Sequence, residues 1–300
     1  MDDKEKGMVL ASFAGDSLSL AAHWVYDTNT IKRNFGRIES FFKPASNSFH
    51  PTKEDGEFTH YGDQTLVLLE SLAEKRGFEL KDFAQKWRSF FENYRGYFDQ
   101  ATKVTLSRFS SDMPPEESGS PSDDLGGVSR IAPLVYAYRD DLKGLMNASK
   151  AQTAMTHRDP IVLKSAVFFS RLTWQILKGD TPTHAIDKIA REHFEQSPIY
   201  NWVQIGLASK DMDTVSVISN FGQSCHTREA LPGVIHIIAR HEKDLKEALI
   251  QCVMSGGDSA ARAMIVGMVL GAHLGCGPIP ADWTTGLKAR EKILDLLERI

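Results

Sequence analysis

Three places in the sequence set a carboxylate directly after a glycine, at the predicted beginning of an apolar helix. They are Gly15-Asp16, Gly62-Asp63-Gln64-Thr65 and Gly257-Asp258-Ser259. Carboxylate oxygens are the ligands that magnesium and calcium ions prefer, so Asp63 and Asp258 could hold one hard cation together. Aspartate is also among the most common helix N-caps. The spacing by itself favours the simpler explanation, in which each aspartate caps its own helix.

A fourth junction, Gly126-Gly127-Val128-Ser129-Arg130, adds a cation and two flexible glycines. Ligand sites in helical folds often lie among helix ends, where backbone N–H groups suit anions. His157 and His23 are further candidates, although a lone histidine more often has a structural role. The neighbours Trp24 and Asp27 are compatible with a polar pocket edge at His23. No Ser-His-Asp or Cys-His triad can be assembled from the spacing.

The elements that would position these residues are predicted to be helices. Apolar residues recur at helical spacing, and almost no segment alternates as a strand does. The fold class is therefore predicted to be all-α, with a single compact domain over residues 1–300. A first helix at about 5–22 is expected to be interrupted near Gly15-Asp16. Another helix is expected to begin at Tyr61. The later helices are predicted at about 80–94, 100–109, 142–155, 160–178, 182–194, 201–208, 213–219, 228–241, 244–255, 259–274, 280–290 and 291–300.

Two long stretches without a hydrophobic period, 35–59 and 110–127, are predicted loops. Loops of this length in compact domains are usually functional or disordered. The first contains five phenylalanines, which argue against disorder. We therefore predict that it forms a lid or a pocket wall.

The composition excludes several classes of function. The 300-residue chain has a net charge of −4 and no basic stripe, so a nucleic-acid partner is not expected. The N-terminus is charged and begins acidic, unlike a secretory signal, and no apolar run reaches the ~18 residues of a membrane span. Cys225, Cys252 and Cys276 are too few and too far apart for a disulfide framework or a zinc knuckle. These features predict a cytoplasmic protein without a membrane partner.

Six short motifs occur in the order typical of the ADP-ribosylglycohydrolase family, which the chain resembles from about Val9 to its C-terminus. They are Gly15-Asp16-Ser17-Leu18, Gly62-Asp63-Gln64-Thr65, Arg130-Ile131-Ala132-Pro133-Leu134, Thr156-His157 with Pro160, Ala230-Leu231-Pro232 and Gly256-Gly257-Asp258-Ser259. The resemblance implies a compact all-α domain with a central cleft. It also implies hydrolysis of the glycosidic bond between ADP-ribose and an acceptor, with two magnesium ions at the cleft floor.

The chain departs from the family pattern at the metal ligands. His23 stands where the family's first motif carries a glutamate, and Gln64 replaces one of two adjacent aspartates. Ala260 and Ala261 replace a further aspartate and a threonine. Two magnesium ions need several anionic oxygens to offset their charge, so the two-magnesium mechanism is predicted not to be intact. Imidazole is a better ligand for zinc or another transition ion than for magnesium.

Two functional hypotheses follow from the resemblance. In the first, the protein binds or hydrolyses an ADP-ribose-like ligand or ADP-ribosylated acceptor, with one magnesium ion or none. Asp63 and Asp258 would then be the catalytic residues and metal ligands. The ligand site would include Asp16, His23, Asp27, Gln64, Gly126, Gly127, Ser129, Arg130 and His157. In the second, the protein keeps the fold without hydrolase activity, as its similarity to jellyfish lens crystallins suggests.

Overall fold

The computed structural model describes residues 2–300 and confirms the all-α fold in one compact domain. Within these residues the chain forms α1 (Asp3–Ser19), α2 (Thr28–Phe35), α3 (His60–Lys75), α4 (Leu80–Glu92), α5 (Gln100–Phe109), α6 (Gly126–Ser129), α7 (Ala132–Ala137), α8 (Leu142–Ala154), α9 (Pro160–Leu177), α10 (Pro182–Phe194), α11 (Pro198–Ala208), α12 (Thr214–Phe221), α13 (Thr227–Arg240), α14 (Leu245–Met254), α15 (Ser259–Leu274), α16 (Ala281–Gly286) and α17 (Arg290–Glu298). No helix of residues 2–300 is long and apolar enough to cross a membrane.

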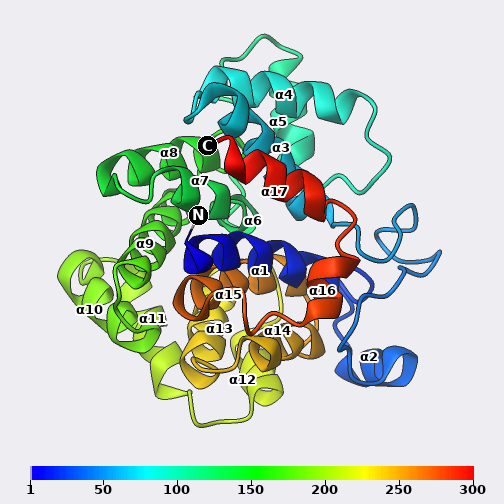
Figure 1. Cartoon of the computed structure of the whole chain (residues 1–300), viewed down its shortest axis with the longest axis vertical. Helices are drawn as coiled ribbons and strands as arrows, with labels where there is room; N and C mark the ends of the chain where they lie inside the picture. Colours follow the sequence, from blue (N-terminus) through cyan, green and yellow to red (C-terminus); the bar gives the residue numbers. More distant parts are fainter. Residues whose placement is uncertain (1) are drawn as a thin grey trace.

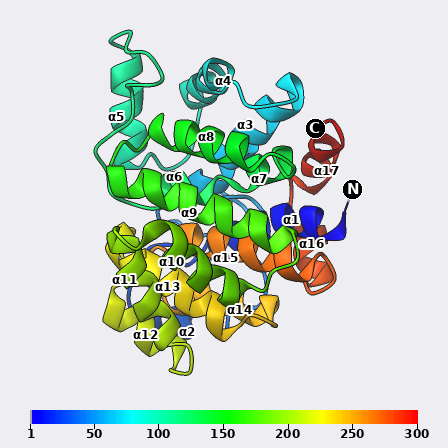
Figure 2. The ribbon, with the colours of Figure 1, turned by 90° about the vertical axis from the view of Figure 1, so that its left-hand side faces the viewer.

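The first and fifteenth helices run side by side through the centre of the molecule (Figure 1). Helices α9, α13 and α14 pack against α15, while α3 and α7 pack against α1 (Figure 2). Every residue of α15 except its last two is buried, which explains why its sequence between Ala263 and Ala272 is entirely apolar. The central pair therefore forms the middle of the hydrophobic core.

Small residues allow the backbones of α1 and α15 to approach closely. A Cβ atom added at Gly267 would lie 2.3 Å from the carbonyl oxygen of Ala11, and one at Gly15 would lie 2.7 Å from that of Ala263. Because residue 11 faces 267 and residue 15 faces 263, the two helices are antiparallel. The C-terminal end of α1 thus lies beside the N-terminal end of α15, where Asp258 is the N-cap.

The predicted interruption of the first helix near Gly15-Asp16 is wrong, since α1 continues through Ser19. Glycine is a poor helix former by itself, and that was the basis of the prediction. Here Gly15 is retained inside a helix because a side chain would collide with α15. Tertiary packing therefore overrides the local helix propensity.

Asp16 joins α1 to the beginning of α3. Its two carboxylate oxygens accept hydrogen bonds from Thr59 N at 2.7 Å and Thr59 Oγ1 at 2.6 Å. A Cβ atom at Gly62 would lie 2.4 Å from Asp16 Oδ2, so the carboxylate fits only against a glycine. Burial raises the pKa of Asp16 to about 7, although the Thr59 hydrogen bonds act in the opposite direction.

The predicted loop at 35–59 is confirmed between α2 and α3, and it is folded onto the domain. His50 and Phe58 in this loop are buried. The C-terminal region holds it in place, because Trp283 Nε1 donates to the Glu39 carbonyl at 2.7 Å and Lys288 N donates to that of Gly56 at 3.0 Å. The second predicted loop ends slightly earlier than expected, where α6 begins at Gly126.

Replacing Gly267 by alanine is expected to lower the free energy of unfolding by about 1–3 kcal/mol. The new methyl group would overlap the Ala11 backbone and push α1 away from α15. Urea denaturation of Gly267→Ala measures the change. Gly277→Ala is the control, because a Cβ atom there meets nothing within 4 Å. Equal stability of the two variants would contradict the close packing.

Replacing Asp16 by asparagine is expected to make stability less sensitive to pH. The folded-state pKa is raised to about 7, so the folded protein keeps a proton that the unfolded chain loses above about pH 4. The free energy of unfolding of the wild type should therefore fall by up to about 4 kcal/mol relative to that of Asp16→Asn between pH 4 and 7. Above pH 8 it should fall no further. Denaturation series at these pH values provide the measurement.

The control for that series is Asp27→Asn at an exposed cap. Hydrogen bonds from Thr30 and Asn29 lower the pKa of Asp27. The difference in free energy of unfolding between Asp27→Asn and the wild type should not change between pH 4 and 7 as it does for Asp16→Asn. A pH-independent difference for Asp16→Asn as well would contradict the assigned pKa.

Candidate functional site

The Gly256-Gly257 turn brings the segment after α1 next to Asp258. Both glycines have positive φ, +70° and +67°, and a Cβ atom on Gly257 would lie 2.0 Å from the Gln223 carbonyl oxygen. Trp24 N donates to the Gly257 carbonyl at 2.9 Å, and Gly257 N donates to that of Val25 at 2.9 Å. These reciprocal bonds hold residues 23–25 against the beginning of α15.

Asp258 is a buried carboxylate with contacts to three elements. Its Oδ1 caps α15 by accepting from Ala261 N at 3.4 Å, which confirms the capping role. The hydroxyl of Tyr61 donates to Oδ2 at 3.3 Å, and Nδ1 of His23 lies 3.7 Å from Oδ1. Burial raises the pKa of Asp258 to about 6, with a further contribution from the negative charge of Asp124. The cap is therefore also part of an inter-helix polar cluster.

Asp63 is paired with a cation that belongs to the protein. Its Oδ2 accepts from Lys53 Nζ at 2.6 Å and from the Tyr94 hydroxyl at 2.6 Å. Burial raises the pKa of Asp63, and Lys53 partly offsets this effect. Sequence reasoning missed Lys53 because it lies in the loop without a hydrophobic period, where no pattern indicated which side chains face inward.

Three histidines gather beside these aspartates. His23 follows α1, His50 belongs to the loop and His60 begins α3, one turn before Asp63. All three are buried, and each offers a ring nitrogen such that the three nitrogens lie within 4.8 Å of one another. Within residues 2–300 no other group of three or more His, Cys, Asp or Glu side chains has this spacing. The group contains neither Asp63 nor Asp258. His50 and His60 were not among the predicted site residues.

His157 has the structural role of a hydrogen-bonded buried histidine. Its Nε2 lies 2.9 Å from Asp124 Oδ1 and its Nδ1 lies 2.8 Å from Thr156 Oγ1. A Cβ atom at Gly127 would lie 2.9 Å from His157 Nδ1, and one at Gly126 would lie 2.6 Å from the Tyr61 ring. These glycines thus allow side chains to pack against the short helix α6.

Arg130 and Gln64 form a buried link between α3 and the segment after α8. The Arg130 guanidinium donates to Gln64 Oε1 and, at 2.5 Å, to Thr156 Oγ1. Trp87 Nε1 donates to the same Gln64 oxygen at 2.8 Å. The hydroxyl of Ser129 donates to the Gly126 carbonyl. A ligand that contacts the Arg130 guanidinium, as predicted, would have to replace these bonds.

Asp27 lies away from the buried cluster. Its side chain is exposed and caps α2, since Oδ1 accepts from Asn29 N at 3.0 Å and Oδ2 from Thr30 Oγ1 at 2.6 Å. Capping a helix is a common role of aspartate, and this is the role that Asp27 has. It does not contribute to the floor of a site in this structure.

An aromatic layer covers the histidines. Trp24 stacks on His23 with ring centroids 4.2 Å apart, and it contacts Phe49 at 4.9 Å and Tyr97 at 4.8 Å. Trp24 has φ of +62°, which is rare for a bulky residue and costs conformational energy. The backbone bond to Gly257 maintains this conformation. The indole is thereby held over His23.

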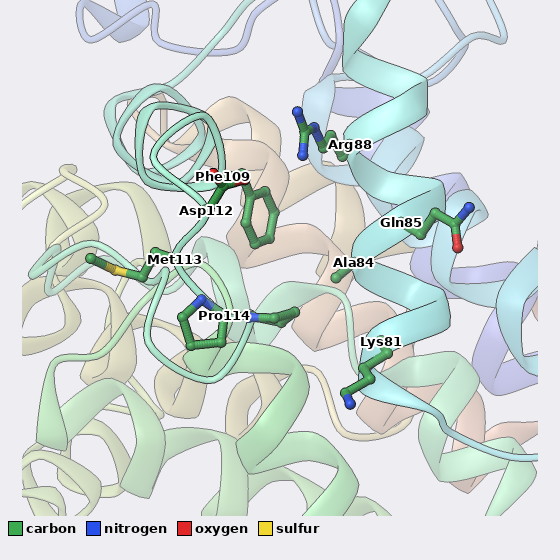
Figure 3. Close-up of a pocket in the computed structure, with 9 residues that line it drawn as sticks. Lys81, Ala84, Gln85, Arg88, Phe109, Asp112, Met113 and Pro114 are labelled. Atoms are coloured by element: carbon green, nitrogen blue, oxygen red, sulfur yellow. The ribbon is translucent and has the colours of Figure 1, made fainter.

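A groove of about 490 Å³ lies on the outer side of this layer. It is lined by Ser48, Phe49, Pro51, Thr52, Arg95, Gly96, Tyr97, Phe98 and Lys103, and no acidic side chain is among them. Another pocket of about 350 Å³ lies between α4 and the segment after α5, where Lys81, Arg88 and Asp112 line it (Figure 3). This second pocket contains none of the predicted site residues.

The residues at the family's metal position do not fit magnesium. Magnesium requires several oxygen ligands in near-octahedral geometry. Here Asp63 Oδ2 is already bonded to the Lys53 ammonium and the Tyr94 hydroxyl. The nearby donors are imidazole nitrogens of His23, His50 and His60, which suit transition ions instead.

Comparison with known proteins agrees with this architecture. The family model "ADP-ribosylglycohydrolase" matches residues 1–300. Crystallin J1A of Tripedalia cystophora is 24% identical, over 99% of this chain and 96% of its own. ADP-ribosylhydrolase ARH3 of Homo sapiens is 20% identical, over 96% of this chain and 90% of its own.

A solved structure described as an ADP-ribosylglycohydrolase-related protein complex superimposes with a TM-score of 0.77 at 23% identity. The alignment covers 99% of this chain and 96% of that one, and at this identity it shows a shared fold. The family match over the full length, together with the aspartates at the N-terminal ends of α3 and α15, identifies this chain as a member of the ADP-ribosylglycohydrolase family.

Proposed function

We propose that this protein binds an ADP-ribosyl compound and hydrolyses its glycosidic bond with Asp258 as general base. The observation that carries the proposal is the Asp258 carboxylate, which is buried and oriented by Tyr61 and Ala261. A buried carboxylate whose pKa is raised is a stronger base than one in water. Family membership supplies the class of substrate.

The chemistry would proceed without magnesium. Asp258 takes a proton from a water molecule, and the water oxygen forms a bond to the anomeric carbon of the ribose. The bond from that carbon to the acceptor breaks, and the acceptor leaves with the bonding electrons and takes up a proton. Tyr61 keeps the Asp258 carboxylate in position during this step. The Lys53–Asp63 ion pair supports the neighbouring turn of α3.

The groove beside the aromatic layer has the chemistry of a nucleotide diphosphate site. Arg95 and Lys103 bring positive charge for phosphate oxygens. Phe49 and Tyr97 offer aromatic surfaces against which an adenine can stack, and Phe49 is 48% exposed. The absence of acidic lining residues among those named makes the groove suitable for an anion.

A non-catalytic binding protein is the second candidate. Trp24 lies between the groove and His23, so a ligand reaches Asp258 only when the aromatic layer moves. Without such movement the ADP-ribosyl group would be bound and not hydrolysed. The similarity to crystallin J1A, together with the family carboxylates missing at His23, Gln64 and Ala260, favours this candidate.

Replacing Asp258 by asparagine is expected to reduce hydrolysis of an ADP-ribosylated peptide by about 10²–10⁴-fold, because the amide cannot accept a proton from water. Release of ADP-ribose is measured by chromatography. Asp213→Asn, at the exposed cap of α12, is the matched control and should keep wild-type turnover. Turnover of Asp258→Asn equal to the control would exclude Asp258 as the base.

Replacing Lys103 by alanine is expected to weaken ADP-ribose binding roughly tenfold, equivalent to about 1.4 kcal/mol. Isothermal titration at two salt concentrations tests this, since the phosphate contact should weaken as salt rises. Lys210→Ala removes an exposed lysine outside the groove and serves as the control. If both variants bind as the wild type does, the diphosphate lies elsewhere.

A further inference from the structure

We propose that His23, His50 and His60 form a binding site for a divalent transition metal ion such as Zn²⁺ or Co²⁺. This inference does not depend on the proposed hydrolysis, because it concerns metal binding by the protein alone. It rests on the arrangement of the three rings, on their burial and on the nitrogens that lack a protein partner.

The three histidines are among the most deeply buried polar residues, with exposed fractions of 2%, 1% and 0% for His23, His50 and His60. Within residues 2–300 no protein group forms a hydrogen bond with His23 Nε2 or with either nitrogen of His50 or His60. Buried polar atoms in folded proteins are almost always satisfied, and each exception costs about 1–3 kcal/mol. Several such atoms on three adjacent rings indicate a shared partner.

The spacing of the rings suits one small ion. Their centroids are 5.5 Å apart for His23 and His50, 5.8 Å for His50 and His60, and 6.1 Å for His23 and His60. A tetrahedral Zn²⁺ with bonds of ~2.0–2.1 Å places its nitrogen ligands roughly 3.4 Å apart. The ligand nitrogens here lie within 4.8 Å of one another, so small ring movements complete the site.

Carboxylates lie beside two of the three rings. Asp99 Oδ2 lies 3.2 Å from His60 Nε2, and histidine ligands of zinc commonly donate their second N–H to a carboxylate. His23 Nδ1 accepts a hydrogen bond from Ala260 N at 3.4 Å and lies 3.7 Å from Asp258 Oδ1, so Nε2 is the nitrogen of His23 without a protein partner.

The donor set also selects the class of metal. Three neutral imidazole nitrogens favour Zn²⁺, Co²⁺, Ni²⁺ or Cu²⁺ over Mg²⁺. Three protein ligands leave a fourth position of a tetrahedral ion for water or another small ligand. Trp24 and Tyr97 cover this region, so the ion would be shielded from bulk solvent.

Titration of the chelator-treated full-length protein with Co²⁺ tests the site without any ADP-ribosyl compound. We expect one equivalent per chain to produce visible absorption of tetrahedral cobalt, Zn²⁺ to displace it, and Mg²⁺ to have no effect. Zn²⁺ should also raise the melting temperature, since an ion that binds only the folded state stabilises it. Absence of both the absorption and the shift would overturn the proposal.

The matched variants are His50→Gln and His184→Gln. Loss of the His50 imidazole should weaken Co²⁺ binding by at least about 100-fold. The His184 side chain is 65% exposed and lies outside the cluster, so its replacement should leave Co²⁺ affinity unchanged. Circular dichroism confirms that both variants are folded. Equal Co²⁺ affinity of His50→Gln and the wild type would place the ion elsewhere and reject the three-histidine site. The hydrolysis assay with Asp258→Asn is run without Co²⁺ or Zn²⁺, so its outcome is scored separately from that of the titration.

Discussion

The close antiparallel packing of α1 against α15 is the constraint on which the rest of the structure depends. Gly7, Gly15, Gly267 and Gly271 let the two backbones approach until main-chain atoms are in contact. Dispersion forces at such short separation act along the full length of both helices. The same packing sets the C-terminal end of α1 beside the N-terminal end of α15, and Asp258 can only meet the α1 segment because of it.

Charge at the site is balanced in a way that differs from a dinuclear metal centre. An isolated buried carboxylate is strongly disfavoured, so each aspartate needs a partner. Asp63 has the Lys53 ammonium, and Asp16 has two hydrogen bonds from Thr59. Asp258 has Tyr61 and the end of α15. The protein thereby supplies internally much of what metal cations would supply, and His23, His50 and His60 lie beside these aspartates.

The sequence predicted some parts of this site and missed others for identifiable reasons. Asp258 was found because glycine and aspartate before an apolar helix form a local pattern, and local patterns persist in any fold. Lys53 and His50 were missed because they lie in a loop without periodicity, where neighbouring residues say nothing about which side chains turn inward. Arg130 was predicted to lie in the ligand site because it adds a cation beside two glycines, yet it bonds Gln64 and Thr156 inside the core.

The sequence by itself determined most of the helices, many of their boundaries and the family, since these depend on periodicity, caps and motifs that lie close together along the chain. The boundaries of α5, α10 and α15 agree with the prediction residue for residue. Only the tertiary structure decided which partners the polar residues of the Gly-Asp junctions have. Residues 23, 50 and 60 meet because three separate segments fold onto the α1–α15 pair, and contacts between distant segments are set by packing that no local pattern encodes.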